Sequence, residues 1–96
     1  MTAIAAYHRV AIEAPDGAAA LELERRLANL EPTTISYHGT WVVDVPAVVD
    51  TDEIDAAVQR WLADVGASSS IVLVDGTTHV VKARRRHRAA NADFIG

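Results

Sequence analysis

Three histidines, two carboxylates and one arginine are the side chains of this sequence best suited to acid–base or metal chemistry. Two imidazoles with a carboxylate can bind a divalent cation or transfer a proton. His8 and Glu13 stand near the N-terminus, and no two of the histidines have the short spacing of a metal-binding motif. The sequence therefore predicts no metal site. It leaves open a ligand pocket lined by Arg9, Ser36, His38, Asp44 and His79.

Other signatures of catalysis are missing from the sequence. The chain has no cysteine, which excludes disulfides, thiolate metal ligands and thiol catalysis. The glycine-rich patterns that bind phosphate are absent. The acidic run in residues 50–55 lacks the alternating ligands and the glycine of a calcium loop. We therefore expect a non-enzymatic protein without a cofactor, and an enzyme or small-ligand-binding protein that uses the pocket is the alternative.

The strongest chemical signal is a reversal of charge near residue 82. Residues 1–81 carry four arginines against twelve carboxylates, a formal net charge of −8. Residues 82–96 carry five basic side chains against one carboxylate, a net charge of +4. An acidic body with a short basic tail is typical of binding or assembly components, because such a tail attracts anionic partners. The tail residues predicted to bind a partner are Arg84, Arg85, Arg86, Arg88, Phe94 and Ile95.

Three interpretations of residues 84–96 stay open. A solvated tail would protect an exposed edge strand with positive charge. In the second interpretation the tail docks on a protein: the arginines attract the partner, and Phe94 with Ile95 anchors the tail in it. Alternatively, Phe94 and Ile95 pack on their own domain. Binding of a nucleic acid would use about four phosphate contacts, but the acidic body opposes it and the predicted sheet lacks stacking aromatics. We expect a flexible tail that docks on protein in preference to nucleic acid.

Alternating strands and helices must position all of these side chains. Residues 7–14 alternate between polar and apolar, as a half-buried strand does, and Pro15 ends the pattern. A leucine-rich stripe after Asp16 predicts a helix over 16–30. Residues 33–38 and 40–45 are predicted strands joined at His38-Gly39, and Pro46 is expected to end the second of them.

The second half of the chain repeats this order. Asp50, with Glu53 three residues later, predicts the start of a helix over 50–65 that Gly66 ends. Residues 71–74 and 77–82 are predicted strands joined by Asp75-Gly76, a strong signal for a type I′ turn.

The element order predicts an α+β fold, a two-layer ferredoxin-like (split βαβ) sandwich. Its mostly antiparallel sheet has both helices on one face and the strand order 4-1-3-2, with the extra strand beside the fourth. Residues 1–83 are expected to form this single domain. Both tryptophans, Trp41 and Trp61, are expected in the core.

The sheet face without helices is the predicted interaction surface. Strand alternation assigns Thr34, Ser36 and His38 to this face and directs Ile35 and Tyr37 into the core. In the last hairpin it directs Ile71, Leu73 and Val80 into the core. The apolar residues assigned to the open face are Ala11, Val42, Val72, Val74 and Val81. Exposed apolar area on a small protein often marks an interface, although β-branched residues also suit strands that have no partner.

The expected function is therefore that of a protein-binding or assembly module, with a homodimer as one form. A nucleic-acid-binding accessory protein that acts through the arginine tail is an alternative. The first residues lack the basic region of a signal peptide, and no apolar run reaches the ~20 residues that cross a bilayer. We expect a cytoplasmic protein with no membrane partner.

Overall fold

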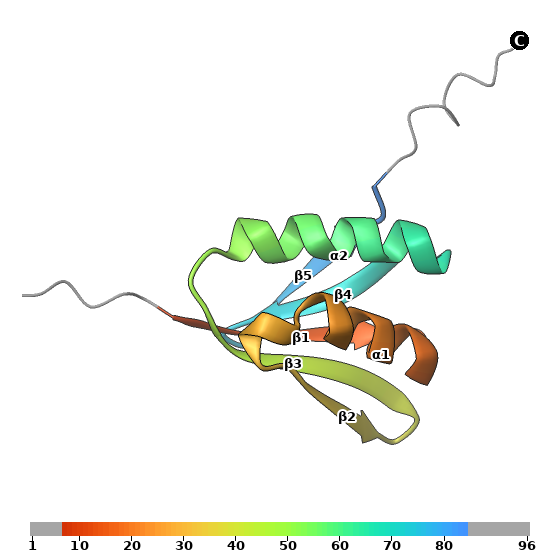
Figure 1. Ribbon diagram of the computed structural model, residues 1–96, viewed down its shortest axis with the longest axis horizontal. Coiled ribbons are helices and arrows are strands. Elements are labelled where there is room, and N and C mark those ends of the chain that lie inside the picture. Colours follow the sequence, from red (N-terminus) through yellow and green to blue (C-terminus); the bar gives the residue numbers. More distant parts are fainter. Residues whose placement is uncertain (1–6, 85–96) are drawn as a thin grey trace, which may run out of the picture.

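The computed structural model describes residues 7–84, which form one antiparallel sheet and two α-helices (Figure 1). The helices and strands are β1 (His8–Ala14), α1 (Gly17–Arg26), the short 3₁₀ helix η1 (Ala28–Leu30), β2 (Thr33–Tyr37), β3 (Thr40–Val48), α2 (Thr51–Val65), β4 (Ser69–Val74) and β5 (Thr77–Lys82). The strand order is β2-β3-β1-β4-β5, and both helices cover the same face of the sheet (Figure 1). The predicted α+β class is confirmed, and this order agrees with the predicted one.

Capping residues set the helix ends as the sequence predicted. The carboxylate of Asp16 accepts a hydrogen bond from the N–H of Ala19 at 2.8 Å, which caps α1. Asp50 caps α2 by accepting from the N–H of Asp52 at 3.0 Å. Gly66 ends α2 with a φ of 78°, which glycine adopts without a steric penalty. The predicted first helix is shorter than expected, because η1 replaces its last turn.

Both hairpins have the predicted turns. The central residues all have positive φ: 51° and 80° at His38-Gly39, and 52° and 84° at Asp75-Gly76. Positive φ at both central positions defines the type I′ turn, whose twist matches that of the flanking strands. These two turns therefore determine which residues of each hairpin pair across the strands.

The prediction that Pro46 ends its strand is wrong, because β3 continues to Val48. The register between β1 and β3 shifts at this point: Val10 pairs with Val45, and His8 pairs with Val48. Pro46 therefore lies in a bulge, where a missing N–H costs no regular ladder bond. The extra residue also lets Val45 and Val48 both point to the buried side of the sheet.

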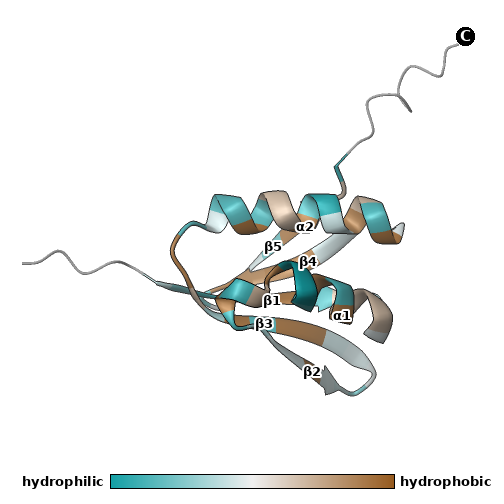
Figure 2. Ribbon diagram, viewed as in Figure 1, coloured by the Kyte–Doolittle hydropathy of each residue, from teal (hydrophilic) through white to brown (hydrophobic). Residues whose placement is uncertain are grey.

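The core lies between the helices and the sheet. Figure 2 shows hydrophobic residues along the central strands and a mixture of hydrophobic and hydrophilic residues along α2. Trp61 is 0 % exposed, and its indole N–H donates to the carbonyl of Ala19 at 2.8 Å, which ties α2 to α1. Trp41 is half-buried and packs on Gly17, where an added Cβ would lie 3.0 Å from the indole. The core position predicted for Trp61 is confirmed, whereas Trp41 lies at the edge of the core.

Thr34→Val is expected to stabilise the protein. The hydroxyl of Thr34 is buried, and it has no hydrogen-bond partner among the described residues. An unsatisfied buried polar group costs about 1–3 kcal/mol, and valine has the same shape without the hydroxyl. We expect urea denaturation to show a free energy of unfolding higher by about 1 kcal/mol. The same change at Thr33, which is exposed, is the control. An equal gain at both positions would point to strand propensity as the cause instead.

Candidate protein-interaction surface

The sheet face opposite the helices, which we name the open face, carries one row of side chains that crosses all five strands. The register pairs Ile35 with Val42 and Val42 with Glu13. Because Ile12 pairs with Val72, the next residues of β1 and β4 are also neighbours, and Ile71 pairs with Val80. From β2 to β5 the row therefore consists of Ile35, Val42, Glu13, Ile71 and Val80. It is apolar except at its centre.

The apolar side chains of this row reach solvent. Ile35 is 46 % exposed, Ile71 38 % and Val80 62 %. Ala11 and Leu73 pair with each other in the neighbouring row and are half-buried. Exposed apolar residues gathered on one face of a small protein often mark an interaction site.

Three residues predicted for the open face are on the opposite side of the sheet. Val72 pairs with the buried Ile12 and is 0 % exposed. Val81 is 7 % exposed, and Val74 pairs with Val10 on the helix side. Asp75-Gly76 determines the pairing within the hairpin but not which face of the hairpin turns toward the helices. Ile71, Leu73 and Val80, predicted for the core, consequently form part of the open face. Ala11 and Val42 lie where they were predicted.

The faces of β2 are exchanged in the same way. Ile35 pairs with Val42 and therefore shares the open face with it, as does Tyr37, which is 69 % exposed. Thr34 and Ser36 consequently lie on the helix side. The alternation in this strand is misleading because β2 is a largely exposed edge strand, so its apolar residues do not mark the buried side.

The predicted pocket residues do not come together. Arg9 and Asp44 form a two-pronged ion pair on the open face, with Nη2 3.1 Å from one carboxylate oxygen and Nε 3.3 Å from the other. This hydrogen bond and the charge of Asp44 raise the pKa of Arg9. His38 lies in the β2–β3 turn, and His79 pairs with Val72 and so belongs to the helix side. Among residues 7–84, no group of three or more His, Asp and Glu side chains is placed to hold a metal ion.

His8 takes part in a contact that the sequence did not suggest. Its Nδ1 lies 2.7 Å from Oδ2 of Asp75, while Oδ1 of Asp75 accepts from the backbone N–H of Arg9 at 2.9 Å. The N–H of Asp75 in turn donates to the carbonyl of Arg9 at 2.8 Å. These bonds tie the β4–β5 turn to the start of β1. They lower the pKa of Asp75, mainly through the hydrogen bond to His8 and then through the N–H of Arg9.

Asp75→Asn is expected to lower the melting temperature at neutral pH but not in acid. Asparagine keeps the turn, because it also accepts positive φ, so the change removes mainly the charge. A carboxyl with a lowered folded-state pKa stabilises the protein above its unfolded value, near 4, and loses that contribution as the pH falls through the folded pKa. The difference in melting temperature between the two proteins should therefore disappear once the pH falls below the folded-state pKa of Asp75. A difference that stays constant from pH 7 to pH 2 would contradict this role of the charge.

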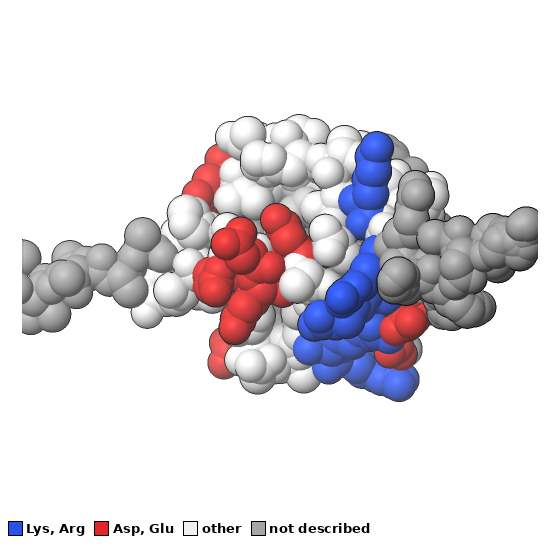
Figure 3. Space-filling model, turned by 90° about the horizontal axis from the view of Figure 1, so that it is seen from above, with Lys and Arg blue, Asp and Glu red and all other residues white. Residues whose placement is uncertain are grey.

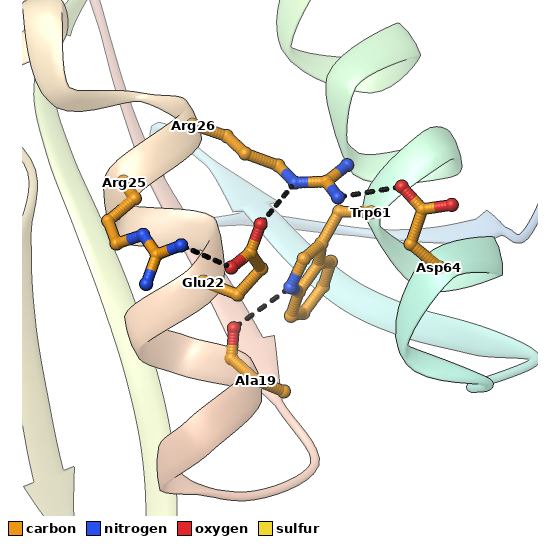
Figure 4. A network of polar contacts seen from close by, with 6 residues as sticks. All are labelled: Ala19, Glu22, Arg25, Arg26, Trp61 and Asp64. Carbon is orange, nitrogen blue, oxygen red and sulfur yellow. Dashed lines mark hydrogen bonds and ion pairs between the residues drawn. The ribbon is translucent and has the colours of Figure 1, made fainter.

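A second polar cluster joins the two helices (Figure 4). Arg26 lies between Glu22 and Asp64, with nitrogen–oxygen distances of 3.2 Å and 2.6 Å, and Arg25 lies 3.3 Å from Glu22. The hydrogen bond to Asp64 is the main cause that raises the pKa of Arg26. Every charge in this cluster has a partner from the protein itself. We therefore assign it to the packing of α1 on α2, beside the bond from Trp61 to Ala19.

Charges on the helix side are unevenly distributed. Figure 3 shows acidic side chains gathered toward one end and most basic ones toward the other. Asp52 and Glu53 lie in the first turn of α2. Arg84 is exposed, and its backbone N–H donates to the carbonyl of Gln59 at 3.1 Å, so the chain leaves β5 alongside α2. The other predicted tail residues, Arg85, Arg86, Arg88, Phe94 and Ile95, lie outside the described residues.

Comparison with protein-family models, with curated proteins and with solved structures finds no match for this chain. Within residues 7–84, neither helix combines the length and the apolar character needed to span a membrane. Within the described residues, the open face has exposed large apolar side chains from β2, β4 and β5.

Proposed function

We propose that this protein is a non-enzymatic protein-binding or assembly module that acts through its open face, with the basic C-terminal tail assisting the encounter. The observation that carries the proposal is the apolar row Ile35, Val42, Ile71 and Val80 on a sheet face that no described element covers. Charged residues usually occupy such a solvent-facing side. Here the only charge in the row is the central Glu13.

The size of the open face supports a modest affinity. Five strands spaced ~4.8 Å apart, each with about six residues at ~3.3 Å, give a face of roughly 24 by 20 Å. A partner that covered it would bury about 1,000 Å² in total, the lower end of the range for specific interfaces. We therefore expect a weak or transient complex. Positive charge on the tail would speed association with an acidic partner more than it would tighten the complex.

The position of Glu13 favours a partner that differs from this chain. A two-fold axis that lays the apolar row on a copy of itself keeps the central residue at the centre, so Glu13 would meet the Glu13 of the other copy. Two carboxylates brought together in a partly dry interface repel each other. A complementary partner instead has an apolar surface with one basic group at its centre.

Ile71→Lys is expected to abolish partner binding while the protein stays folded. The matched control is Val49→Lys, because Val49 is 61 % exposed and lies in the loop before α2, away from the open face. The 96-residue protein and both variants would be used as baits, each with and without nuclease. The captured proteins would be compared by quantitative mass spectrometry. A purified candidate partner would then be titrated by calorimetry against all three proteins.

Loss of binding by at least tenfold in Ile71→Lys alone would support the proposal. Equal binding to all three baits would refute it. A partner lost only on nuclease treatment would indicate the nucleic-acid alternative. Glu13→Lys adds a further check, since a partner with a basic centre should also bind this variant at least tenfold more weakly.

A further inference from the structure

Strand β2 presents an unprotected edge. It is the outermost strand on its side of the sheet, and four of its five residues are exposed. Thr33–Tyr37 contains no charged residue, and Pro32 precedes the strand without interrupting it. Edge strands normally avoid pairing with other chains through charges, bulges or a covering element. None of these protects the described residues of β2.

The opposite edge of the sheet has basic residues at one end. Strand β5 ends in Lys82, and the exposed Arg84 follows two residues later. The backbone N–H of Arg84 is bonded to the carbonyl of Gln59, so the chain turns from β5 toward α2. The two edges of one sheet therefore differ in charge: β2 contains no charged residue, whereas β5 ends in Lys82.

The turn geometry determines which backbone groups of β2 point outward. Tyr37 and Thr40 are the first and fourth residues of the His38-Gly39 turn, the pair that the hydrogen bond of such a turn joins. Backbone groups alternate between the two sides of an antiparallel strand. The groups of Thr33, Ile35 and Tyr37 therefore face β3. The N–H and C=O groups of Thr34 and Ser36 face away from the sheet.

We propose that β2 pairs with β2 of a second copy of this chain, antiparallel and about a two-fold axis at Ile35. An antiparallel strand pair is symmetric about such an axis, so one strand suffices to build the interface. In this register Thr34 and Ser36 of each copy exchange backbone hydrogen bonds with Ser36 and Thr34 of the other. The two five-stranded sheets then join into one continuous sheet.

The same register brings the exposed apolar side chains of β2 together. Ile35 of one copy lies opposite Ile35 of the other on the open face, and Tyr37 lies opposite Thr33. Aromatic and β-branched neighbours across strands stabilise a sheet. In this dimer Glu13 lies on β1, the third strand from the axis, so the dimer avoids the carboxylate pair that face-to-face stacking creates. It is independent of the partner-binding proposal, and it would unite two open faces into one larger platform.

A single introduced cysteine tests the register directly, because the chain has none of its own. Opposed residues at a pair without backbone hydrogen bonds have Cα atoms about 4.5 Å apart, which is within the range that a disulfide bridges. Full-length Ile35→Cys at several hundred micromolar is expected to become mostly covalent dimer on mild oxidation. The control is Val80→Cys, which lies at the other end of the same row on β5 and is more exposed. It should give only the few per cent of dimer expected from random collision.

Equal cross-linking of the two cysteine variants would overturn the proposal. Ile35→Lys provides a second test by sedimentation at the same concentration, since like charges placed opposite each other would separate the copies. Dimer should persist in Val80→Lys and Ile71→Lys. Dimer lost in Ile71→Lys but kept in Ile35→Lys would locate self-association on the open face and refute pairing at β2. If β2 pairs as proposed and Ile71→Lys still captures every partner of the parent protein, only the proposed function is refuted.

Discussion

Replacing Val72 by lysine is expected to unfold the protein, whereas the same change at the adjacent Ile71 is expected to leave it folded. Val72 is 0 % exposed and pairs with the equally buried Ile12. A buried ammonium group without a partner costs several kcal/mol, a large part of the 5–15 kcal/mol that stabilises a typical domain. Ile71 is 38 % exposed and lies on the open face, so its lysine can reach water.

Far-UV circular dichroism and urea denaturation of the two variants would measure this contrast. We expect no cooperative transition for Val72→Lys. For Ile71→Lys we expect a transition whose free energy differs from that of the parent by about 1 kcal/mol or less. The opposite result, with Ile71→Lys unfolded and Val72→Lys folded, would mean that the last hairpin has its other face toward the helices. The open face would then need to be reassigned.

Trp61→Phe is expected to produce the second-largest effect, a loss of about 2–4 kcal/mol in the free energy of unfolding. The indole is fully buried, so a smaller ring leaves a void in a close-packed core. The change also removes the N–H donor to the carbonyl of Ala19, which is the buried polar bond between the two helices. Both losses act on the same packing contact between α1 and α2.

Trp41→Phe is the matched control, because Trp41 is half-buried and the described residues provide no hydrogen bond to its indole. We expect about 1 kcal/mol of destabilisation there. Each variant also keeps one tryptophan as a fluorescent probe, and emission of the protein that retains only Trp61 should lie at shorter wavelength. Equal losses of stability in the two variants would show that the helix–helix bond contributes little.

Both interaction proposals place function on the sheet and assign the helices to support. The Arg26 cluster and Trp61 hold α1 and α2 together on one face. Within residues 7–84, no element covers the other face or the β2 edge. This division is common in two-layer folds, where one side of an antiparallel sheet is packed and the other is available. Variants on the helix side should accordingly change stability, and variants such as Ile71→Lys should change binding.

Local chemistry in the sequence determined the order, type and turns of the elements. Asp16 and Asp50 cap their helices, Gly66 ends α2, and the two glycine-containing turns have the positive φ values that their residues favour. Each of these effects acts within a few residues and needs no distant contact. The element order then limits the topology to few arrangements, and for this reason the strand order could be predicted as well.

Only the tertiary structure decided which face of β2 and which face of the β4–β5 hairpin is buried. Ile71, Val72, Leu73 and Val74 are all apolar, so alternation along β4 offers two equivalent choices, and pairing with Ile12 of β1 selects one. A shift of one residue in register exchanges every side chain between the faces. In β2, Ile35 is exposed because its strand lies at the edge of the sheet. The sequence of a single strand does not reveal where that strand lies in the sheet. The open face follows from contacts between strands far apart in the chain, which no local pattern records.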